Sequence, residues 1–276
     1  MVSRTPPRSV TQFLRKEVNF GCPVQGCGNP YLTWHHFDPR WNVKKHHNAD
    51  GMIALCTNHA PLADGERWTK EQLREMKQKP FVTKGKIEEY YGYQRRDVVC
   101  MIGNIAFNVR NVLEIDGESV IRFEKDSNGY NTLNILIRDI NGSIILQMEN
   151  NLWTVYTEHL FDLICPAQGK ELTIISKDNR TNFEIRYDDY SRLDFESLLY
   201  DNGFTSNNIM DFISGIGAPT TIPVCRIAGN LAWRNYHLRI TTSDLTEMNQ
   251  GISIKGGFVI GCDNAVTLEH GTISFG

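Results

Sequence analysis

Short apolar runs rich in β-branched residues recur through the last two thirds of the chain. Turn-forming pairs stand between them, among them Asp116-Gly117, Asn128-Gly129 and Asn141-Gly142, which supply the positive φ angles of tight hairpins. A spacing of about ten residues between runs favours a sandwich, a barrel or a solenoid for residues 97–276. No internal repeat is clear enough to choose the solenoid. The runs are VVCMIG, NVLEID, SVIRFE, LNILIRD, SIILQM, LTIIS, FEIRY, LRITT, ISIKGGFVIG and AVTLEHGTISF.

Helical patterns are few. The segment TKEQLREMK has one apolar face, and Thr69 and Gln72 have the spacing of a capping box, so we expect a helix over about residues 70–77. A second helix is expected at 206–213, within the β-rich part. Residues 11–18 form a short amphipathic stretch that could pack on either part of the chain.

The segment KPFVTKGKIEEYYGYQRR is charged and aromatic and contains two glycines and one proline. This composition is typical of a connector, with one short helix at most. We therefore divide the chain into an N-terminal domain at 1–79 with an N-terminal extension, a linker at 80–96 and a β-rich domain at 97–276. The fold class expected for the whole chain is α+β.

The chain has 276 residues, of which 41% are hydrophobic and 10% aromatic, enough material for two packed cores. It contains no run of eighteen apolar residues, and its amino terminus lacks the apolar stretch of a signal peptide. These features predict neither a membrane span nor secretion. The expected location is the cytoplasm.

The net charge of −3 conceals an asymmetry. Residues 1–100 carry 16 Lys and Arg against 10 Asp and Glu, whereas residues 101–276 carry 13 against 22. A basic part of this kind suits a polyanion bound through its phosphates, although an excess of six positive charges is also common on solvated surfaces.

Histidine and cysteine cluster in the N-terminal part. Five of the eight histidines lie between His35 and His59, interleaved with Cys22, Cys27 and Cys56. Zinc prefers four such ligands in a tetrahedron, usually supplied as two short-range pairs. Cys22-x4-Cys27, among three glycines, and Cys56-x2-His59 form two such pairs. We therefore predict a structural zinc site with these four residues.

Two alternatives remain open for this cluster. The cysteines could be ordinary core residues, and His59 could face a catalytic metal instead of the zinc. The remaining cysteines lie in apolar, strand-like surroundings and are interpreted as small buried hydrophobic residues. They are Cys100, Cys165, Cys225 and Cys262.

The segment between the ligand pairs carries a family resemblance. YLTWHHFDPRW reads as a strand that ends in two adjacent histidines, and a polar loop, GMIALCTNH and ADGERWTKEQLREMK follow it. This order resembles the HNH endonuclease family over about residues 20–79. The resemblance implies a ββα-metal fold and hydrolysis of phosphodiester bonds by one divalent metal ion, Mg²⁺ or Mn²⁺, next to a structural Zn²⁺.

The resemblance also implies roles for the two histidines. His36 would be the general base and His35 a ligand of the catalytic metal. Adjacent strand residues point to opposite faces, so the two cannot do the same job in a regular strand. A plainer interpretation makes one of them an additional zinc ligand or a buried polar residue. Asp38 could bind the metal or support its ligands, but an Asp before Pro39 also has an ordinary role in turns.

Two positions depart from the family pattern. The usual Asn, five residues before the zinc-turn cysteine, falls on Gly51, and the His or Asn expected early in the helix falls on Ala60. His47, Asn48 and Asp64 could substitute for them. If none of the three reaches the metal, the module would be a weak enzyme or only a binding unit.

Several basic residues could follow a phosphate backbone, and DNA is the favoured polymer. No element that would read base edges is visible, so we expect little sequence preference from this domain. The tryptophans here could stack on bases, but a small zinc module needs most of them for its core. The expected backbone contacts are Arg40, Lys44, Lys45, Arg67, Lys70, Arg74 and Lys77.

The sequence therefore predicts a metal-dependent endonuclease. The acidic β-rich domain would control it through a protein partner, self-assembly or ligand sensing, in the manner of a bacterial or phage defence effector. One rival function is a non-catalytic zinc-binding interaction protein. Another is a sequence-specific homing or restriction nuclease, which would require the acidic domain to bind DNA.

Overall fold

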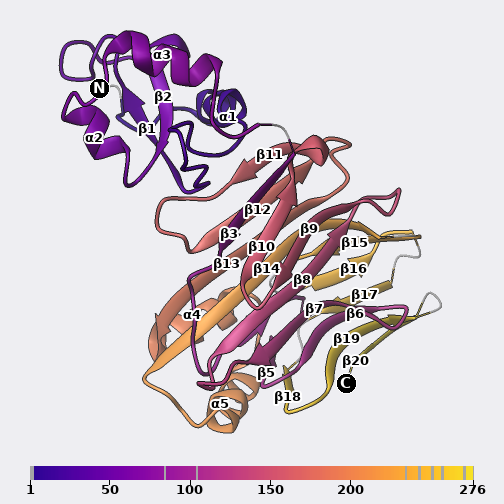
Figure 1. Cartoon of the computed structure of the whole chain (residues 1–276). Helices are drawn as coiled ribbons and strands as arrows, with labels where there is room; N and C mark the ends of the chain where they lie inside the picture. The colour runs from indigo at the N-terminus through magenta and orange to yellow at the C-terminus, as the bar shows by residue number, and fades with distance from the viewer. Residues whose placement is uncertain are drawn as a thin grey trace.

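The computed structural model describes residues 3–83, 85–103, 105–233, 235–241, 244–249, 252–255, 258–269 and 272–275. It has mixed α and β structure, with strand predominating, and it places a small N-terminal unit beside two large open sheets (Figure 1). None of the helices in these residues combines the length and the apolar character needed to cross a bilayer.

The N-terminal module, residues 3–79, is built on one antiparallel hairpin whose register pairs Leu32 with Cys56 and His36 with Met52. Its core consists mainly of apolar residues from the hairpin and from the three helices, including Leu14, Ile53, Ala63 and Leu73. The elements are α1 (Arg8–Glu17), β1 (Leu32–His36), the 3-10 turn η1 (Ala49–Gly51), β2 (Met52–Cys56), α2 (Ala60–Asp64) and α3 (Lys70–Gln78).

The helix expected at residues 70–77 is present as α3, and the amphipathic stretch at 11–18 lies mostly in helix α1. In α3 the Thr69 side chain accepts from the Gln72 backbone N–H, and the Gln72 side chain accepts from the Thr69 N–H, which completes the capping box. Helix α1 covers most of the amphipathic stretch and buries Leu14 against the hairpin. The local capping and periodicity signals were sufficient here.

The first large sheet has eight strands in the order β20-β19-β6-β7-β8-β9-β10-β3. The expected hairpin pairs occupy its turns: φ is +49° at Asp116, +74° at Gly117, +78° at Gly129 and +83° at Gly142. The strands are β3 (Lys86–Tyr90), β6 (Asn111–Ile115), β7 (Glu118–Lys125), β8 (Asn131–Arg138), β9 (Ile144–Glu149), β10 (Leu152–Tyr156), β19 (Asn264–Glu269) and β20 (Thr272–Phe275).

The second sheet is organised by β14, the longest of the described strands. Its residues 221–230 pair with β13, residues 229–233 pair with β15, and residues 224–226 pair in parallel with β4. Its strands are β4 (Val99–Met101), β5 (Ile105–Phe107), β11 (Leu160–Ile164), β12 (Glu171–Ser176), β13 (Asn182–Ser191), β14 (Thr221–Trp233), β15 (Tyr236–Ile240), β16 (Asp244–Glu247), β17 (Ile252–Lys255) and β18 (Phe258–Ile260). A 3-10 turn, η2 (Thr157–His159), precedes β11.

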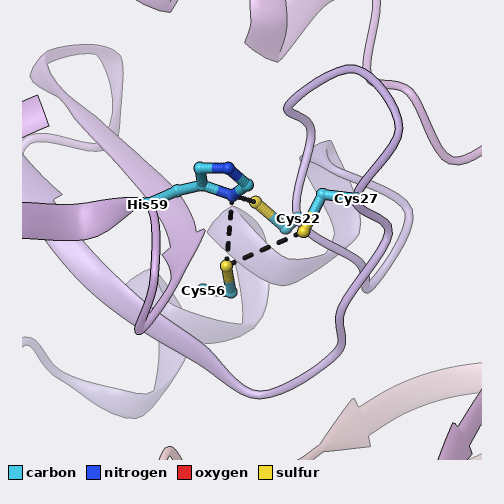
Figure 2. A group of neighbouring side chains, drawn as sticks. All are labelled: Cys22, Cys27, Cys56 and His59. Atoms are coloured by element: carbon cyan, nitrogen blue, oxygen red, sulfur yellow. Dashed lines mark hydrogen bonds between the residues drawn. The ribbon is translucent and has the colours of Figure 1, made fainter. Parts of the chain in front are cut away.

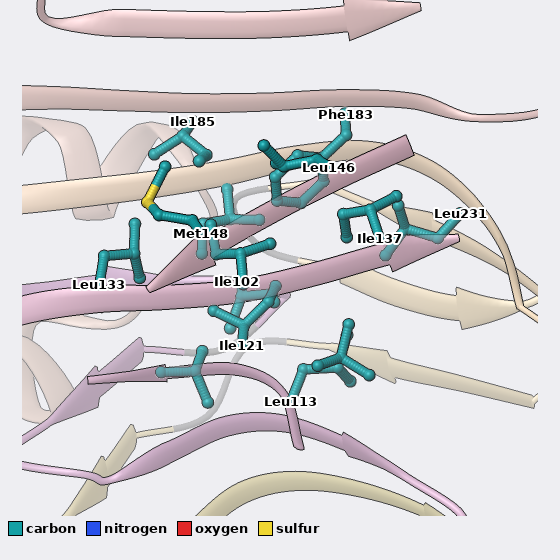
Figure 3. Packing of buried hydrophobic residues seen from close by; sticks show 14 of the residues in the cluster. Ile102, Leu113, Ile121, Leu133, Ile137, Leu146, Met148, Phe183, Ile185 and Leu231 are labelled. Carbon is teal, nitrogen blue, oxygen red and sulfur yellow. The ribbon is translucent and has the colours of Figure 1, made fainter. Parts of the chain in front are cut away.

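The two sheets pack face to face around one large apolar core. Figure 3 shows Leu146 and Met148 of the first sheet directed toward Phe183 and Ile185 of the second. Neither sheet closes on itself within the described residues. Of the three architectures expected from the sequence, this arrangement is that of a sandwich.

Two helices cover one end of the sandwich and form a smaller core together with β4, β5 and β14. The expected helix at 206–213 is α5 (Ser206–Gly215), and α4 (Arg192–Asp201) lies next to it (Figure 1). Phe195 of α4 and Phe212 of α5 are both buried in this cluster. Helix α4 was not predicted, because its apolar residues fall on more than one face.

The secondary structure expected for residues 80–96 was wrong. Instead of a connector with a short helix, Lys86–Tyr90 form strand β3, which pairs antiparallel with β10. Ile87 is the only buried side chain of β3. Glu88 is exposed and Glu89 is half-buried. A strand that buries so little has a weak alternating pattern, and tertiary pairing with β10 provides its stability.

The four scattered cysteines divide three to one. Cys100, Cys165 and Cys225 are buried in the large core, as expected for small hydrophobic residues. Cys262 is partly exposed, so that interpretation was wrong for this residue. It follows the short edge strand β18, where the chain turns toward β19, and it packs against the large core only in part.

A buried ion pair joins the N-terminal module to the second sheet. Arg15 of α1 donates to both carboxylate oxygens of Asp162 in β11, at 2.9 and 2.7 Å, and the Asp162 side chain is fully buried. Lys16 lies 3.6 Å from the centre of the Phe161 ring. The module is thus attached through α1 at the edge of the sheet formed by β11.

Candidate functional site

The four residues expected to bind zinc come together in the structure. Cys22 and Cys27 lie in the loop before β1, Cys56 ends β2, and His59 precedes α2, so one cluster joins three segments (Figure 2). Their ligand atoms all lie within 4.8 Å of one another. The cluster could bind a metal ion such as zinc.

The spacing of these atoms fits a tetrahedral ion. Cys27 Sγ lies 3.7 Å from Cys56 Sγ, and His59 Nδ1 lies 3.4 Å from Cys22 Sγ and 3.2 Å from Cys56 Sγ. Zn–S bonds of about 2.3 Å place two sulfurs of a tetrahedron roughly 3.8 Å apart, whereas a disulfide needs about 2.05 Å. The residues therefore fit a structural metal better than a disulfide.

The loop that carries the first pair depends on its glycines. Gly26 and Gly28 have φ of +79° and +68°, a region that side chains rarely allow. Burial raises the pKa of the Cys22 and Cys27 thiols. A metal ion would have to displace their protons, so metal binding would be coupled to proton release at this site.

The two adjacent histidines line an open cleft of about 690 Å³ between the hairpin, α2 and the N-terminal segment. Both side chains are buried except for about 6% of their surface. His35 Nδ1 lies 3.0 Å from a carboxylate oxygen of Asp64, which is 65% exposed. Of the three substitutes considered for the missing family residues, Asp64 therefore does reach a histidine of the cleft.

His36 faces the loop that connects the two strands. Its ring centre lies 4.8 Å from that of Trp41, 5.3 Å from that of His46 and 5.7 Å from that of His47. Desolvation, together with the neighbouring His46, lowers the pKa of His36 to about 4, so the ring is neutral at pH 7. His47 thus approaches the site from the loop.

Asn48 does not reach the cleft. Its side chain accepts from the Asp50 backbone N–H at 3.2 Å and caps the η1 turn. The other replacement position, Ala60, lines the cleft without offering a ligand atom. The expectation of Asn48 as a metal-site residue is therefore not supported by its contacts.

Asp38 has a different set of partners from the one expected for a metal ligand. Its carboxylate accepts from Lys70 at 2.6 Å and also from Arg74, both on α3. The hydrogen bond from Lys70 lowers the pKa of Asp38. Asp38 therefore joins the end of the first strand to α3, and it neutralises part of the charge that Lys70 and Arg74 were expected to offer to phosphates.

Gly51 explains one departure from the family pattern. A Cβ atom at this position would lie 1.8 Å from the backbone carbonyl oxygen of Asp38 and 3.1 Å from the His46 ring. Any side chain here, including the asparagine of the family, would overlap the backbone of Asp38. The segment that follows β1 therefore packs too closely against Gly51 for an asparagine to fit.

The other expected phosphate contacts vary in their availability. Arg40 lines the cleft and pairs with Glu66 at 2.8 Å, and the exposed Arg67 lies over the Trp68 ring. Lys44 and Lys45 are exposed on the loop. Lys77 is buried and donates to the Ala49 carbonyl oxygen, so the expectation for this residue was wrong.

The structure adds residues that the sequence did not indicate. Arg4, Thr5 and Pro6 line the cleft, and the Ser3 carbonyl oxygen lies 2.9 Å from His47 Nε2. Arg4 is exposed and has no ion-pair partner among the described residues. No sequence signal places this segment at the cleft, because the contact depends on how the chain before α1 folds back.

Comparisons with known proteins add no further assignment. A scan against protein-family models, a search of the curated proteins and a search of the solved structures each gave no match.

Proposed function

We propose that the N-terminal module is a metal-dependent endonuclease that hydrolyses phosphodiester bonds of nucleic acid, with DNA as the favoured substrate. One observation carries this proposal: His35, oriented by the Asp64 carboxylate, lies beside His36 in an open cleft. The hairpin, the helices and the Cys22, Cys27, Cys56, His59 cluster that surround it agree with the ββα-metal resemblance of residues 20–79.

The chemistry of the proposed reaction is hydrolysis. A water oxygen forms a bond to phosphorus, an imidazole nitrogen of the cleft takes the water proton, and the phosphorus–oxygen bond on the opposite side breaks. The leaving oxygen then takes a proton from solvent. The Asp64 carboxylate would stabilise His35 in its protonated form. A divalent ion, when bound, would polarise the phosphate and offset the charge on the leaving oxygen.

Exposed cations around the cleft suit a phosphate backbone. Arg4 and Arg40 line the cleft, and Lys44 and Lys45 lie on the adjacent loop. Such contacts position a polyanion without reading its sequence, so cleavage with little sequence preference is expected. The net charge of −9 over residues 101–276 disfavours DNA binding there, and we assign the β-rich region to control through a partner, self-assembly or a ligand.

Nicking of supercoiled plasmid tests this proposal. Purified full-length protein is incubated with Mg²⁺, Mn²⁺ or EDTA, and wild type is compared with His35→Ala and His36→Ala after the zinc content of each has been measured. We expect metal-dependent nicking that both variants lose while they keep their zinc. His159→Ala is the matched control, because His159 lies on η2 in the β-rich region.

A second candidate function is a non-catalytic zinc-binding interaction protein. Gly51 and Ala60 favour it, because they remove two polar side chains that the resemblance would place near the metal. Exposed Leu193 and Met210 on α4 and α5 could contribute to such contacts. This function predicts no nicking with any metal, together with a partner retained by both His35→Ala and His36→Ala.

A further inference from the structure

Two imidazole nitrogens beside the cleft are buried and have no hydrogen-bond partner within the described part of the chain. They are Nε2 of His36, at the end of β1, and Nδ1 of His47, in the loop that follows. Their ring centres are 5.7 Å apart. A buried polar atom without a partner lowers the stability of the fold. We therefore expect a ligand or water that interacts with both nitrogens.

The hydrogen bonds of the two rings indicate the state of these nitrogens. His47 Nε2 lies 2.9 Å from the Ser3 carbonyl oxygen, which can only accept, so Nε2 carries the proton and Nδ1 of the neutral ring has a free lone pair. The His36 ring has a hydrogen bond with the backbone of His46, which leaves Nε2 without a partner. An imidazole held through one nitrogen by a carbonyl, with the other bare, is the usual arrangement of a metal ligand.

His46 provides a contrast within the same loop. Its Nε2 lies 2.7 Å from the Pro39 carbonyl oxygen, and its Nδ1 accepts from the Asn48 backbone N–H at 3.1 Å. Both nitrogens of this ring are occupied. The bare nitrogens are therefore a property of His36 and His47, and not of every histidine in the loop.

The ring separation is compatible with one shared ion. With metal–nitrogen bonds of about 2.1 Å, each ring centre lies roughly 3.2 Å from the ion, and two rings at a tetrahedral angle have centres about 5.2 Å apart. The observed 5.7 Å requires only a somewhat wider angle. Trp41 stacks on the His47 ring at 5.3 Å between centres and helps to fix its position.

We propose that His36 Nε2 and His47 Nδ1 bind a divalent transition-metal ion, at a site separate from the Cys22, Cys27, Cys56, His59 cluster. Imidazole ligands favour Zn²⁺, Co²⁺ or Ni²⁺ over Mg²⁺ and Mn²⁺, which prefer oxygen. The proposal deepens the proposed function and, for its catalytic meaning, rests on it. In this arrangement His36 binds the ion of the cleft, and His35, paired with Asp64, accepts the proton from water. The family resemblance implies the opposite roles for the two histidines.

Calorimetric titration with Co²⁺ tests the site directly. Full-length protein, carrying its resident zinc, is first dialysed against a weak chelator, and zinc is quantified before and after. We expect wild type to bind one further equivalent of Co²⁺, and His36→Ala and His47→Ala to bind it at least about tenfold more weakly. His159→Ala is expected to bind like wild type.

His47→Gln guards against a folding defect, because glutamine can still donate to the Ser3 carbonyl but has no imidazole nitrogen to bind the ion. Circular dichroism and zinc content establish that each variant is folded. Equal Co²⁺ binding by wild type and folded His47→Gln, or no further equivalent in wild type, would overturn the proposal and leave a bridging water as the occupant. Co²⁺ binding without nicking would support the metal site and contradict the proposed nuclease function. Mg²⁺-dependent nicking without Co²⁺ binding would support the nuclease function and contradict the metal site.

Discussion

His35 and Asp64 form the contact on which the catalytic proposal depends most. The carboxylate is 3.0 Å from Nδ1 and is largely exposed, so it contributes little to packing. The resemblance places a metal ligand at Ala60, near the start of α2. Asp64 lies four residues later, at the end of the same helix. A carboxylate from the next turn of the same helix thus reaches the cleft.

Asp64→Asn is expected to lower the rate of nicking at least tenfold, because a neutral amide neither orients the His35 ring in the same way nor stabilises its protonated form; carboxylates in comparable triads contribute up to about 10⁴-fold. Zinc content and thermal stability should stay close to those of wild type. Single-turnover nicking measures the effect. Glu75→Gln, a change of the same kind at an exposed carboxylate on α3, is the control, and equal rates in both variants would contradict this role for Asp64.

Gly51 is a residue whose identity is fixed by the backbone packed against it. Gly51→Ala should destabilise the protein by about 1–3 kcal/mol, because the new methyl group overlaps the Asp38 carbonyl oxygen. Gly65→Ala is the matched control, since a Cβ there meets its nearest atom at 3.5 Å and φ is −78°. It should be neutral or stabilise by about 0.4–1 kcal/mol. Urea unfolding distinguishes the two variants. Similar unfolding midpoints would show that the backbone around Asp38 moves to accommodate the methyl group.

At the scale of elements, the four-residue metal cluster joins the loop before β1, the end of β2 and the start of α2. The core of the N-terminal module is separate from that of the sandwich. If this cluster binds zinc, as we propose, removal of the zinc should unfold the module and leave the sandwich folded.

A strong chelator with mild denaturant is expected to release about one zinc per chain from the Cys₃His site and to expose residues of the module to protease. Fragments from the sandwich should persist in mass spectrometry. Cys262→Ala should keep its zinc, whereas Cys56→Ala should lose it. A protein that contains no zinc as purified, or that resists protease equally after chelation, would contradict the structural role of this cluster.

The sequence predicted elements well where the signal was local. The capping box of α3, the glycine-containing turns of the first sheet and α5 all depend on residues close in sequence. Strand β3 was missed because its stability comes from pairing with β10, more than sixty residues away. Strand β14 was also missed, because none of the predicted runs covers Thr221–Trp233, and its pairing with β13 joins segments far apart in the sequence.

The candidate site was predictable to a similar extent. The Cys and His spacing indicated the four-residue cluster, because metal ligands come in short-range pairs. The ion pairs of Asp38 with α3 and the position of Arg4 at the cleft were not indicated by the sequence. Both arise from tertiary contacts, which local sequence patterns do not determine.

At the scale of the whole molecule, Arg15 and Asp162 connect the module to the sandwich through a buried ion pair. Asp162→Ala should cost about 3–5 kcal/mol, because it leaves the Arg15 charge buried without its partner. Glu196→Ala removes the partner of Arg192 from an exposed pair on α4 and should cost about 0.5 kcal/mol or less. Thermal unfolding compares the two, and equal shifts would contradict a fixed attachment of the module.

The central claim is that the cleft lined by His35 and His36 hydrolyses phosphodiester bonds, and nicking of supercoiled plasmid by the full-length protein tests it most directly. The account predicts nicking that requires an added divalent ion, stops with EDTA and is lost in His35→Ala protein that retains its zinc. Absence of nicking with Mg²⁺, Mn²⁺ and Co²⁺, or equal nicking by wild type and His35→Ala, would contradict it.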